Sequence, residues 1–346
     1  MKKICLFINA LTAGGAERVC VNYANKLTEE GFKVTILVYH KNDLFYINEL
    51  NKNVNIISLN VKNGIQAISK LIHDITPLNN FDSIISFNHQ IALITFFLKK
   101  VKKLNTKIIA RNVNNLSSDL RKNRSSKIKK LSTRILMHIF YKRMDAYIAQ
   151  CNAMKQDMIN FMRIDEKKIH VIRNPVAKCY KQEKNIKKEY DILYVGRLVQ
   201  QKGIDNLSKI IKLVHKKKKI RILIIGKGEL EYNLREELEK ENIKFEHLKS
   251  SNNLKEYYNK SRMTILTSYY EGYPNVLTES LACGTPVISF DCKSGPSEII
   301  KEGINGYLIP CYDNKNFSEK IIQLLEHKLT FHPEDNNEIK NLFKII

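Results

Sequence analysis

Two glutamates bracket a turn rich in small residues in the stretch EGYPNVLTESLACGTPVIS, residues 271–289. Pro274 suits the first turn of a helix and Gly284 suits its end, so the stretch predicts a loop, a helix, a turn and a strand. Glu271 is then expected in the loop and Glu279 about a turn and a half inside the helix. The helix start attracts phosphate through its free N–H groups, which belong to Asn275, Val276 and Leu277. The pattern therefore predicts a carboxylate beside an anion site.

A second candidate group is a pair of cations in the stretch YVGRLVQQKG. Arg197 lies just past the end of a predicted strand, and Lys202 lies in the loop beyond it. Two such cations can stabilise the negative charge that a departing diphosphate develops, and a site of this kind needs no metal. The alternative is two solvated basic residues in a loop.

A glycine pair follows the first predicted strand, in NALTAGGAERV. Gly14 and Gly15 allow another group to approach the backbone at the start of a helix. The spacing is not G-x-G-x-x-G, and no acidic residue ends the second predicted strand, KVTILVY, to hold an adenosine ribose. These features disfavour a nicotinamide site.

Apolar strands alternate with helices along the chain. The expected helices cover about 16–30, 65–75, 90–101 and a basic 125–144, and a second strand series starts at YDILYVG after a charged linker. This order predicts an α/β protein of two Rossmann-like domains, each with a parallel sheet covered on both faces, and a cleft between them. The expected divisions are 1–180, 181–330, and a C-terminal helix in 331–346 that returns to the first domain.

The formal charge of +23 on 346 residues is concentrated between Lys99 and Arg143, where Asp119 is the only acid. The segment is expected to seek anions such as nucleic acid, lipid headgroups or phosphorylated substrates; the alternative is solvated basic faces. Seven scattered cysteines without C-x-x-C spacing favour a reducing compartment over disulfides or zinc. We read residues 4–10 as a buried strand and expect no membrane-spanning stretch.

The stretches GGAERV, VGRLVQQKGID and EGYPNVLTESLACGTPVISFDCKSGPSEIIKEGINGYLIP resemble the retaining nucleotide-sugar glycosyltransferases of family 4, which have the GT-B fold. The resemblance implies that Glu271 contacts the transferred sugar, Glu279 binds the ribose, and Arg197 and Lys202 hold the diphosphate. It also implies a donor site with no metal, built by Gly14, Gly15, Gly196, Gly272, Asn275, Val276, Leu277 and Glu279.

The sequence departs from the family's pattern in the first domain. Many members have a histidine beside the transferred sugar; here KIIARNVNN offers Arg111, whereas His89 ends a neighbouring predicted strand. His89 is alternatively a helix-start residue without a catalytic role, and Arg111 is alternatively a ligand for an acceptor phosphate. Which of them faces the cleft stays open.

The resemblance implies transfer of a hexosyl or N-acetylhexosaminyl group, from a UDP-sugar more than a GDP-sugar, to an undecaprenyl-diphosphate-linked saccharide in surface polysaccharide synthesis. We expect a cytoplasmic enzyme, peripheral on the inner face of the membrane, with no cofactor, no metal and no nucleic-acid partner. The basic amphipathic segment would contact anionic lipid. The alternatives are a sugar-nucleotide epimerase of the same general fold and a non-catalytic carbohydrate- or nucleic-acid-binding module.

Overall fold

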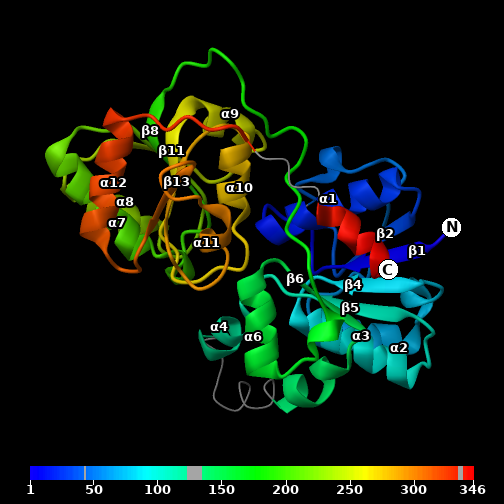
Figure 1. Ribbon diagram of the computed structural model, residues 1–346. Helices are drawn as coiled ribbons and strands as arrows, with labels where there is room; N and C mark the ends of the chain where they lie inside the picture. The colour runs from blue at the N-terminus through cyan, green and yellow to red at the C-terminus, as the bar shows by residue number, and fades with distance from the viewer. Residues whose placement is uncertain (43, 123–134, 334–337) are drawn as a thin grey trace. The chain divides into compact units, whose positions relative to one another are not determined.

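The computed structural model describes all residues except 43, 123–134 and 334–337 (Figure 1). The chain forms two compact units. Unit 1 is Met1–Pro175 together with Asn337–Ile346, and unit 2 is Val176–Asn336. The chain therefore leaves unit 1 after Pro175, before the expected boundary at 180.

Unit 1 contains a seven-stranded sheet in which every pairing is parallel. Most of its strands are buried along nearly their whole length, as expected for a sheet covered on both faces. In spatial order the strands are β3 (Asn55–Ser58), β2 (Lys33–Val38), β1 (Lys3–Phe7), β4 (Ser83–Ser86), β5 (Lys107–Arg111), β6 (Ala146–Ala149) and β7 (Ile169–Val171).

The helices of unit 1 follow the expected alternation. They are α1 (Gly15–Glu29), α2 (Gly64–His73), α3 (His89–Val101), α4 (Leu116–Lys122) and α6 (Asn152–Met162). The basic helix expected at 125–144 falls largely outside the described residues; within them, 135–140 are helical and Tyr141–Arg143 form a short 3-10 helix.

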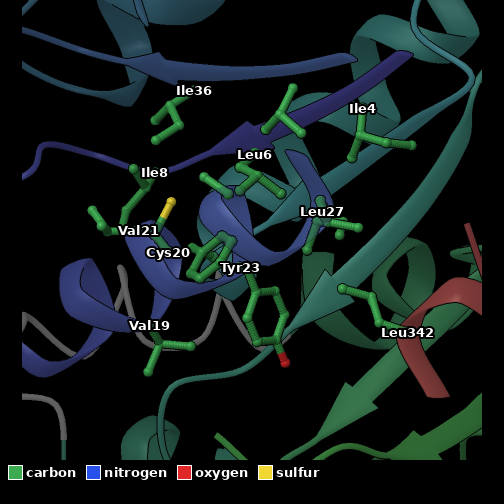
Figure 2. Close-up of a cluster of buried hydrophobic side chains, with 14 of the residues drawn as sticks. Ile4, Leu6, Ile8, Val19, Cys20, Val21, Tyr23, Leu27, Ile36 and Leu342 are labelled. Carbon is green, nitrogen blue, oxygen red and sulfur yellow. The ribbon is translucent and has the colours of Figure 1, made fainter. Parts of the chain in front are cut away.

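The end of the chain packs into the core of unit 1. Glu338–Lys344 form a 3-10 helix, and Ile339, Leu342 and Ile345 join the buried cluster of α1, β1 and β2. Figure 2 shows Leu342 facing this cluster beside Tyr23 and Leu27 of α1. Burial of these apolar side chains attaches the segment to unit 1.

Unit 2 contains a six-stranded sheet, again with only parallel pairings. Its strands, in spatial order, are β10 (Phe245–Leu248), β9 (Ile222–Ile225), β8 (Tyr190–Val195), β11 (Ser261–Leu266), β12 (Val287–Phe290) and β13 (Gly306–Ile309). Its helices are α7 (Ile204–Lys217), α8 (Glu231–Lys240), α9 (Leu254–Lys260), α10 (Asn275–Ala282), α11 (Pro296–Ile299) and α12 (Asn314–Glu326). Both units are thus Rossmann-like, as the sequence predicted.

Candidate functional site

The strand order of unit 2 places two loops side by side. β8 is the first strand of the unit, yet it lies in the middle of the sheet, between β9 and β11. The chain therefore runs outward in opposite directions from β8 and β11, and such a switch point opens a crevice at the carboxyl ends of the strands. The loop after β8 carries Arg197 and Lys202, and the loop after β11 carries Glu271.

Gly203 allows the loops after β8 and β11 to approach closely, and Gly226 does the same for the loops after β9 and β8. Gly203 has a φ of +64°, and a Cβ added there would lie 2.0 Å from the carbonyl oxygen of Thr267. Gly226, after β9, has a φ of +155°, and a Cβ there would lie 1.8 Å from the carbonyl oxygen of Gly196. Because the obstructing atoms belong to the backbone, no side-chain movement would relieve either clash. Only glycine fits at both positions.

A short ion pair joins the two loops. Lys202 Nζ lies 2.6 Å from Glu271 Oε1, and both side chains are largely buried, with 16% and 6% exposed. Ser268 Oγ donates to the same carboxylate oxygen at 2.5 Å, and Thr267 Oγ1 donates to the carbonyl of Lys202 at 3.0 Å. The carboxylate predicted to contact the sugar and the ammonium predicted to hold the diphosphate are therefore neighbours, and each orients the other.

The second predicted cation lies in a different environment. Arg197 is exposed, and its Nη2 donates to Gln201 Oε1 at 3.0 Å. The Gln201 amide in turn donates to the carbonyl of Tyr270 at 3.1 Å. Arg197 is thus held toward the Glu271 loop through Gln201, while its remaining N–H donors suit a bidentate anion.

Glu279 lies inside α10, as predicted, but the structure adds a partner that the sequence did not indicate. Its side chain is buried, and Tyr258 of α9 donates to Oε2 at 3.1 Å. Tyr258 and Ser268 both escaped the sequence analysis. Ser268 stands three residues before Glu271 and was detectable as a strand-end hydroxyl, whereas nothing local links Tyr258 to Glu279.

The start of α10 differs in one respect from the prediction. Pro274 is the N-cap residue, and the N–H of Leu277 donates to its carbonyl at 3.1 Å while the Leu277 side chain is fully buried. The expected free N–H of Leu277 is therefore wrong, because the first helical turn uses it. Asn275 and Val276 are partly exposed, and Gly272 is buried in the preceding loop. The backbone of Gly272 packs closely on Gly295, because a Cβ added to Gly295 would lie 2.5 Å from the Gly272 carbonyl oxygen.

Unit 1 has its own switch point, between β1 and β4. The loop after β1 leads to Gly14, the N-cap residue of α1, and Gly15, its first residue. Asn88 after β4 donates to Asn9 Oδ1 after β1 at 3.1 Å. The carboxylate of Glu17 folds over Gly14, since a Cβ added there would lie 2.2 Å from Glu17 Oε2. An anion that approaches this helix start must displace that carboxylate.

His89 is the first residue of α3 and is partly buried. Burial lowers its pKa to about 4, so the imidazole is neutral near pH 7. Asn88 provides the cap of α3 by accepting from the N–H of Ile91 at 2.8 Å. His89 therefore lies where a helix-start residue is expected, and its imidazole is an uncharged hydrogen-bonding group near pH 7.

Arg111 lies at the end of β5 and is only 1% exposed. Its Nη2 donates to Asn174 Oδ1 at 2.7 Å, and its guanidinium carbon lies 4.9 Å from the ring centre of Phe87 and 5.7 Å from that of Tyr23. Burial lowers the pKa of this guanidinium. An acceptor phosphate, the alternative ligand suggested by the sequence, does not reach Arg111 in this conformation.

The described residues contain neither a metal-binding cluster nor a disulfide. Among the described residues, no group of three or more His, Cys, Asp and Glu side chains is placed to hold a metal ion. All seven cysteines lie in the described part, and none of them forms a disulfide.

Comparisons with known proteins agree on one kind of enzyme. The chain is 39% identical over 141 residues to the amylovoran biosynthesis glycosyltransferase AmsD of Erwinia amylovora, and this match spans 40% of the chain but only 39% of that relative. It is 26% identical over 355 residues to a Campylobacter jejuni protein named GalNAc-alpha-(1->4)-GalNAc-alpha-(1->3)-diNAcBac-PP-undecaprenol alpha-1,4-N-acetyl-D-galactosaminyltransferase, covering 99% of the chain and 94% of the relative.

The fold also matches a solved structure. Anabaena HepE in complex with UDP and glucose superimposes with a TM-score of 0.77 at 15% identity, over 94% of this chain and 90% of that one. Two family models divide the chain between them, Glycosyltransferase Family 4 over residues 13–177 and Glycosyl transferases group 1 over residues 177–342. The chain belongs to the glycosyltransferases that these two models describe, and it has their GT-B class of fold.

Proposed function

We propose that this protein transfers a hexosyl or N-acetylhexosaminyl group from a UDP-sugar to a lipid-linked saccharide during synthesis of a surface polysaccharide. The observation that carries the proposal is the buried Lys202–Glu271 pair beside Arg197 at the switch point of unit 2. The relatives support the substrates, because one is named for an undecaprenol-linked acceptor and one solved structure of similar fold holds UDP and glucose.

The reaction we propose retains the anomeric configuration and uses no metal. The bond between the anomeric carbon and the diphosphate oxygen breaks, and the diphosphate takes the bonding electron pair. Arg197 and Lys202 stabilise that charge, as a metal ion does elsewhere. The acceptor hydroxyl attacks from the same face and gives its proton to the departing phosphate, while Glu271 binds hydroxyls of the transferred sugar.

A nucleotide-release assay tests this function. Purified protein is incubated with a panel of UDP- and GDP-sugars in EDTA, with and without bacterial membrane extract. We expect UDP release from one donor, stimulated by the extract, lost in Glu271→Ala and retained in Glu319→Ala, an exposed glutamate of α12. The configuration of the new linkage, read by NMR, tests retention.

Two outcomes would contradict the proposal. An isomerised nucleotide sugar without released UDP would instead indicate an epimerase. No release from any donor, with the protein folded by circular dichroism, would favour a binding role.

A lipid-linked acceptor places the enzyme at the cytoplasmic membrane surface, and we propose that unit 1 carries the contact. Among the described residues, no helix is long and apolar enough to cross a bilayer. The end of α3 and the helical residues 135–140 both expose apolar side chains, and lysines lie next to those of α3. The two segments are in contact, since the ring centres of Phe96 and Phe140 are 6.3 Å apart. We call this the apolar-basic surface: Phe97, Val101, Ile135, Leu136, Ile139 and Phe140, with Lys100, Lys102 and Lys103.

Vesicle sedimentation tests the apolar-basic surface. We expect binding to anionic vesicles that weakens with salt, because each lysine near an anionic surface contributes about 1 kcal/mol. Leu136→Gln with Ile139→Gln is expected to weaken binding at least about tenfold, since two exposed apolar side chains no longer enter the lipid. Ile65→Gln, at an 81% exposed position of α2, is the matched control. Equal binding to neutral vesicles, or none to anionic ones, would contradict this proposal.

A further inference from the structure

Two tyrosines in ring contact lie at the same edge of the unit 2 sheet as the Lys202–Glu271 pair. Tyr269 follows β11 and Tyr312 follows β13, and their ring centres are 5.7 Å apart with 38° between the ring planes. The backbone N–H of Tyr269 donates to the carbonyl of Gln201 at 2.9 Å. The backbone that carries this tyrosine is thus bonded to the loop that contains Lys202. The pair is therefore held in place relative to the proposed reaction centre.

Tyr312 is an unusual residue in two ways. It is 65% exposed, although it is large and partly apolar, and its φ is +70°. A side chain at such a φ costs on the order of 1 kcal/mol or more, and glycine or asparagine is the ordinary residue there. Neighbouring bonds hold the conformation: Asn314 N–H donates to the carbonyl of Tyr312 at 2.9 Å, and Asp313 N–H donates to that of Pro310 at 3.1 Å. The backbone of Tyr312 is therefore held in a strained conformation in which the phenol ring is exposed to solvent.

The second ring has a fixed orientation. The hydroxyl of Tyr269 donates to Asp205 Oδ2 at 2.6 Å, and Asp205 stands exposed in the first turn of α7. The two phenol rings offer flat apolar faces, and the phenol and carboxylate oxygens offer hydrogen-bond acceptors at the margin. This combination suits a pyranose ring, which has apolar C–H faces and hydroxyls around its edge.

The position favours an acceptor saccharide over the nucleobase of the donor. The resemblance to family 4 implies a base site at the stretch GKGEL after β9, which lies on one side of β8, whereas the tyrosine pair comes from β11 and β13 on the other side. We propose that Tyr269 and Tyr312 form a stacking platform for a sugar ring of the acceptor, adjacent to the one that receives the transferred group. This inference rests on the proposed transferase function.

The decisive variant is Tyr312→Asn, because asparagine accepts the left-handed backbone and removes the ring. In the nucleotide-release assay we expect the half-saturating amount of membrane extract to rise about tenfold, which corresponds to about 1.4 kcal/mol of lost ring contact. The maximal rate and the KM for the UDP-sugar should stay unchanged. Tyr312→Phe keeps the ring and loses only the phenol oxygen, so its half-saturating amount should lie between those of the wild type and Tyr312→Asn. Ile304→Asn, at an exposed residue near the other end of β13, is the control.

A binding experiment separates this inference from the proposed function. Immobilised protein is incubated with detergent-solubilised lipid-linked saccharides from the same extract, and retained sugar is measured after mild acid hydrolysis. We expect the wild type to retain sugar and Tyr312→Asn to retain about tenfold less. Equal retention by both, or none by the wild type, would overturn the platform. Retention without nucleotide release would preserve the platform and refute the transfer reaction.

Discussion

Lys202→Ala is expected to lower turnover at least about 100-fold, because the departing diphosphate loses a preorganised cation in a largely buried site. The same substitution is expected to reduce the free energy of unfolding by about 3 kcal/mol. Glu271, with 6% of its side chain exposed, would lose the ammonium 2.6 Å away, and a buried carboxylate without its partner is costly. Ser268 would remain as a donor to that oxygen.

A double-variant cycle distinguishes the two effects of Lys202. Lys202→Met with Glu271→Gln removes both charges while nearly conserving the side-chain volumes, so we expect the stability to return to within about 1 kcal/mol of the wild type. Turnover should stay low, since neither the cation nor the sugar-binding carboxylate is present. The measurements are denaturant unfolding and initial rates of nucleotide release on the four proteins of the cycle.

Either of two results would count against this assignment. Normal turnover in Lys202→Ala would show that the lysine does not serve the leaving group. Recovery of turnover in the double variant would show that the lysine serves only to neutralise Glu271, and that its catalytic effect is indirect.

The sequence predicted the parts of this site, but not how they pair. Strand ends are recognisable because buried parallel strands are apolar runs, so Arg197 and Glu271 were placed correctly just beyond β8 and β11. That the two loops lie next to each other depends on the strand order of the sheet. In this order β11 lies beside β8, although β9 and β10 come between them in the chain. Alternating helices and strands do not specify that order. The contacts of Lys202 with Glu271 and of Tyr258 with Glu279 therefore emerge only from the fold.

Burial was the second property that local patterns did not reveal. Arg111 and His89 were equivalent candidates in the sequence, yet one is fully buried against Phe87 and the other starts a helix with a neutral ring. Likewise, the N–H of Leu277 was expected to be free, whereas the first turn of α10 is tightened and this N–H donates to the carbonyl of Pro274, three residues earlier. A shift of one residue at a helix end decides which N–H groups are available, and helix ends are the least predictable part of an element.

Arg197→Ala is expected to match Lys202→Ala in activity and to differ from it in stability. Turnover should again fall about 100-fold, because a charge-assisted donor to the diphosphate is lost. Arg197 is exposed, however, and its interaction at 3.0 Å is with the neutral side chain of Gln201, so no buried charge is left without a partner. We expect the free energy of unfolding to change by no more than about 0.5 kcal/mol.

Two further variants test the mechanism behind that expectation. Arg197→Lys keeps a positive charge but loses the planar fork that binds two oxygens, so turnover should recover only in part. Arg221→Ala removes an exposed arginine at the amino end of β9, the opposite edge of the same sheet, and should leave turnover unchanged. If Arg197→Ala turned over normally, or if Arg221→Ala were equally impaired, the loss would reflect the general charge of unit 2 and not a cation placed at the diphosphate. If Arg197→Ala instead lost several kcal/mol of stability, its link through Gln201 to Tyr270 would be holding the two loops together.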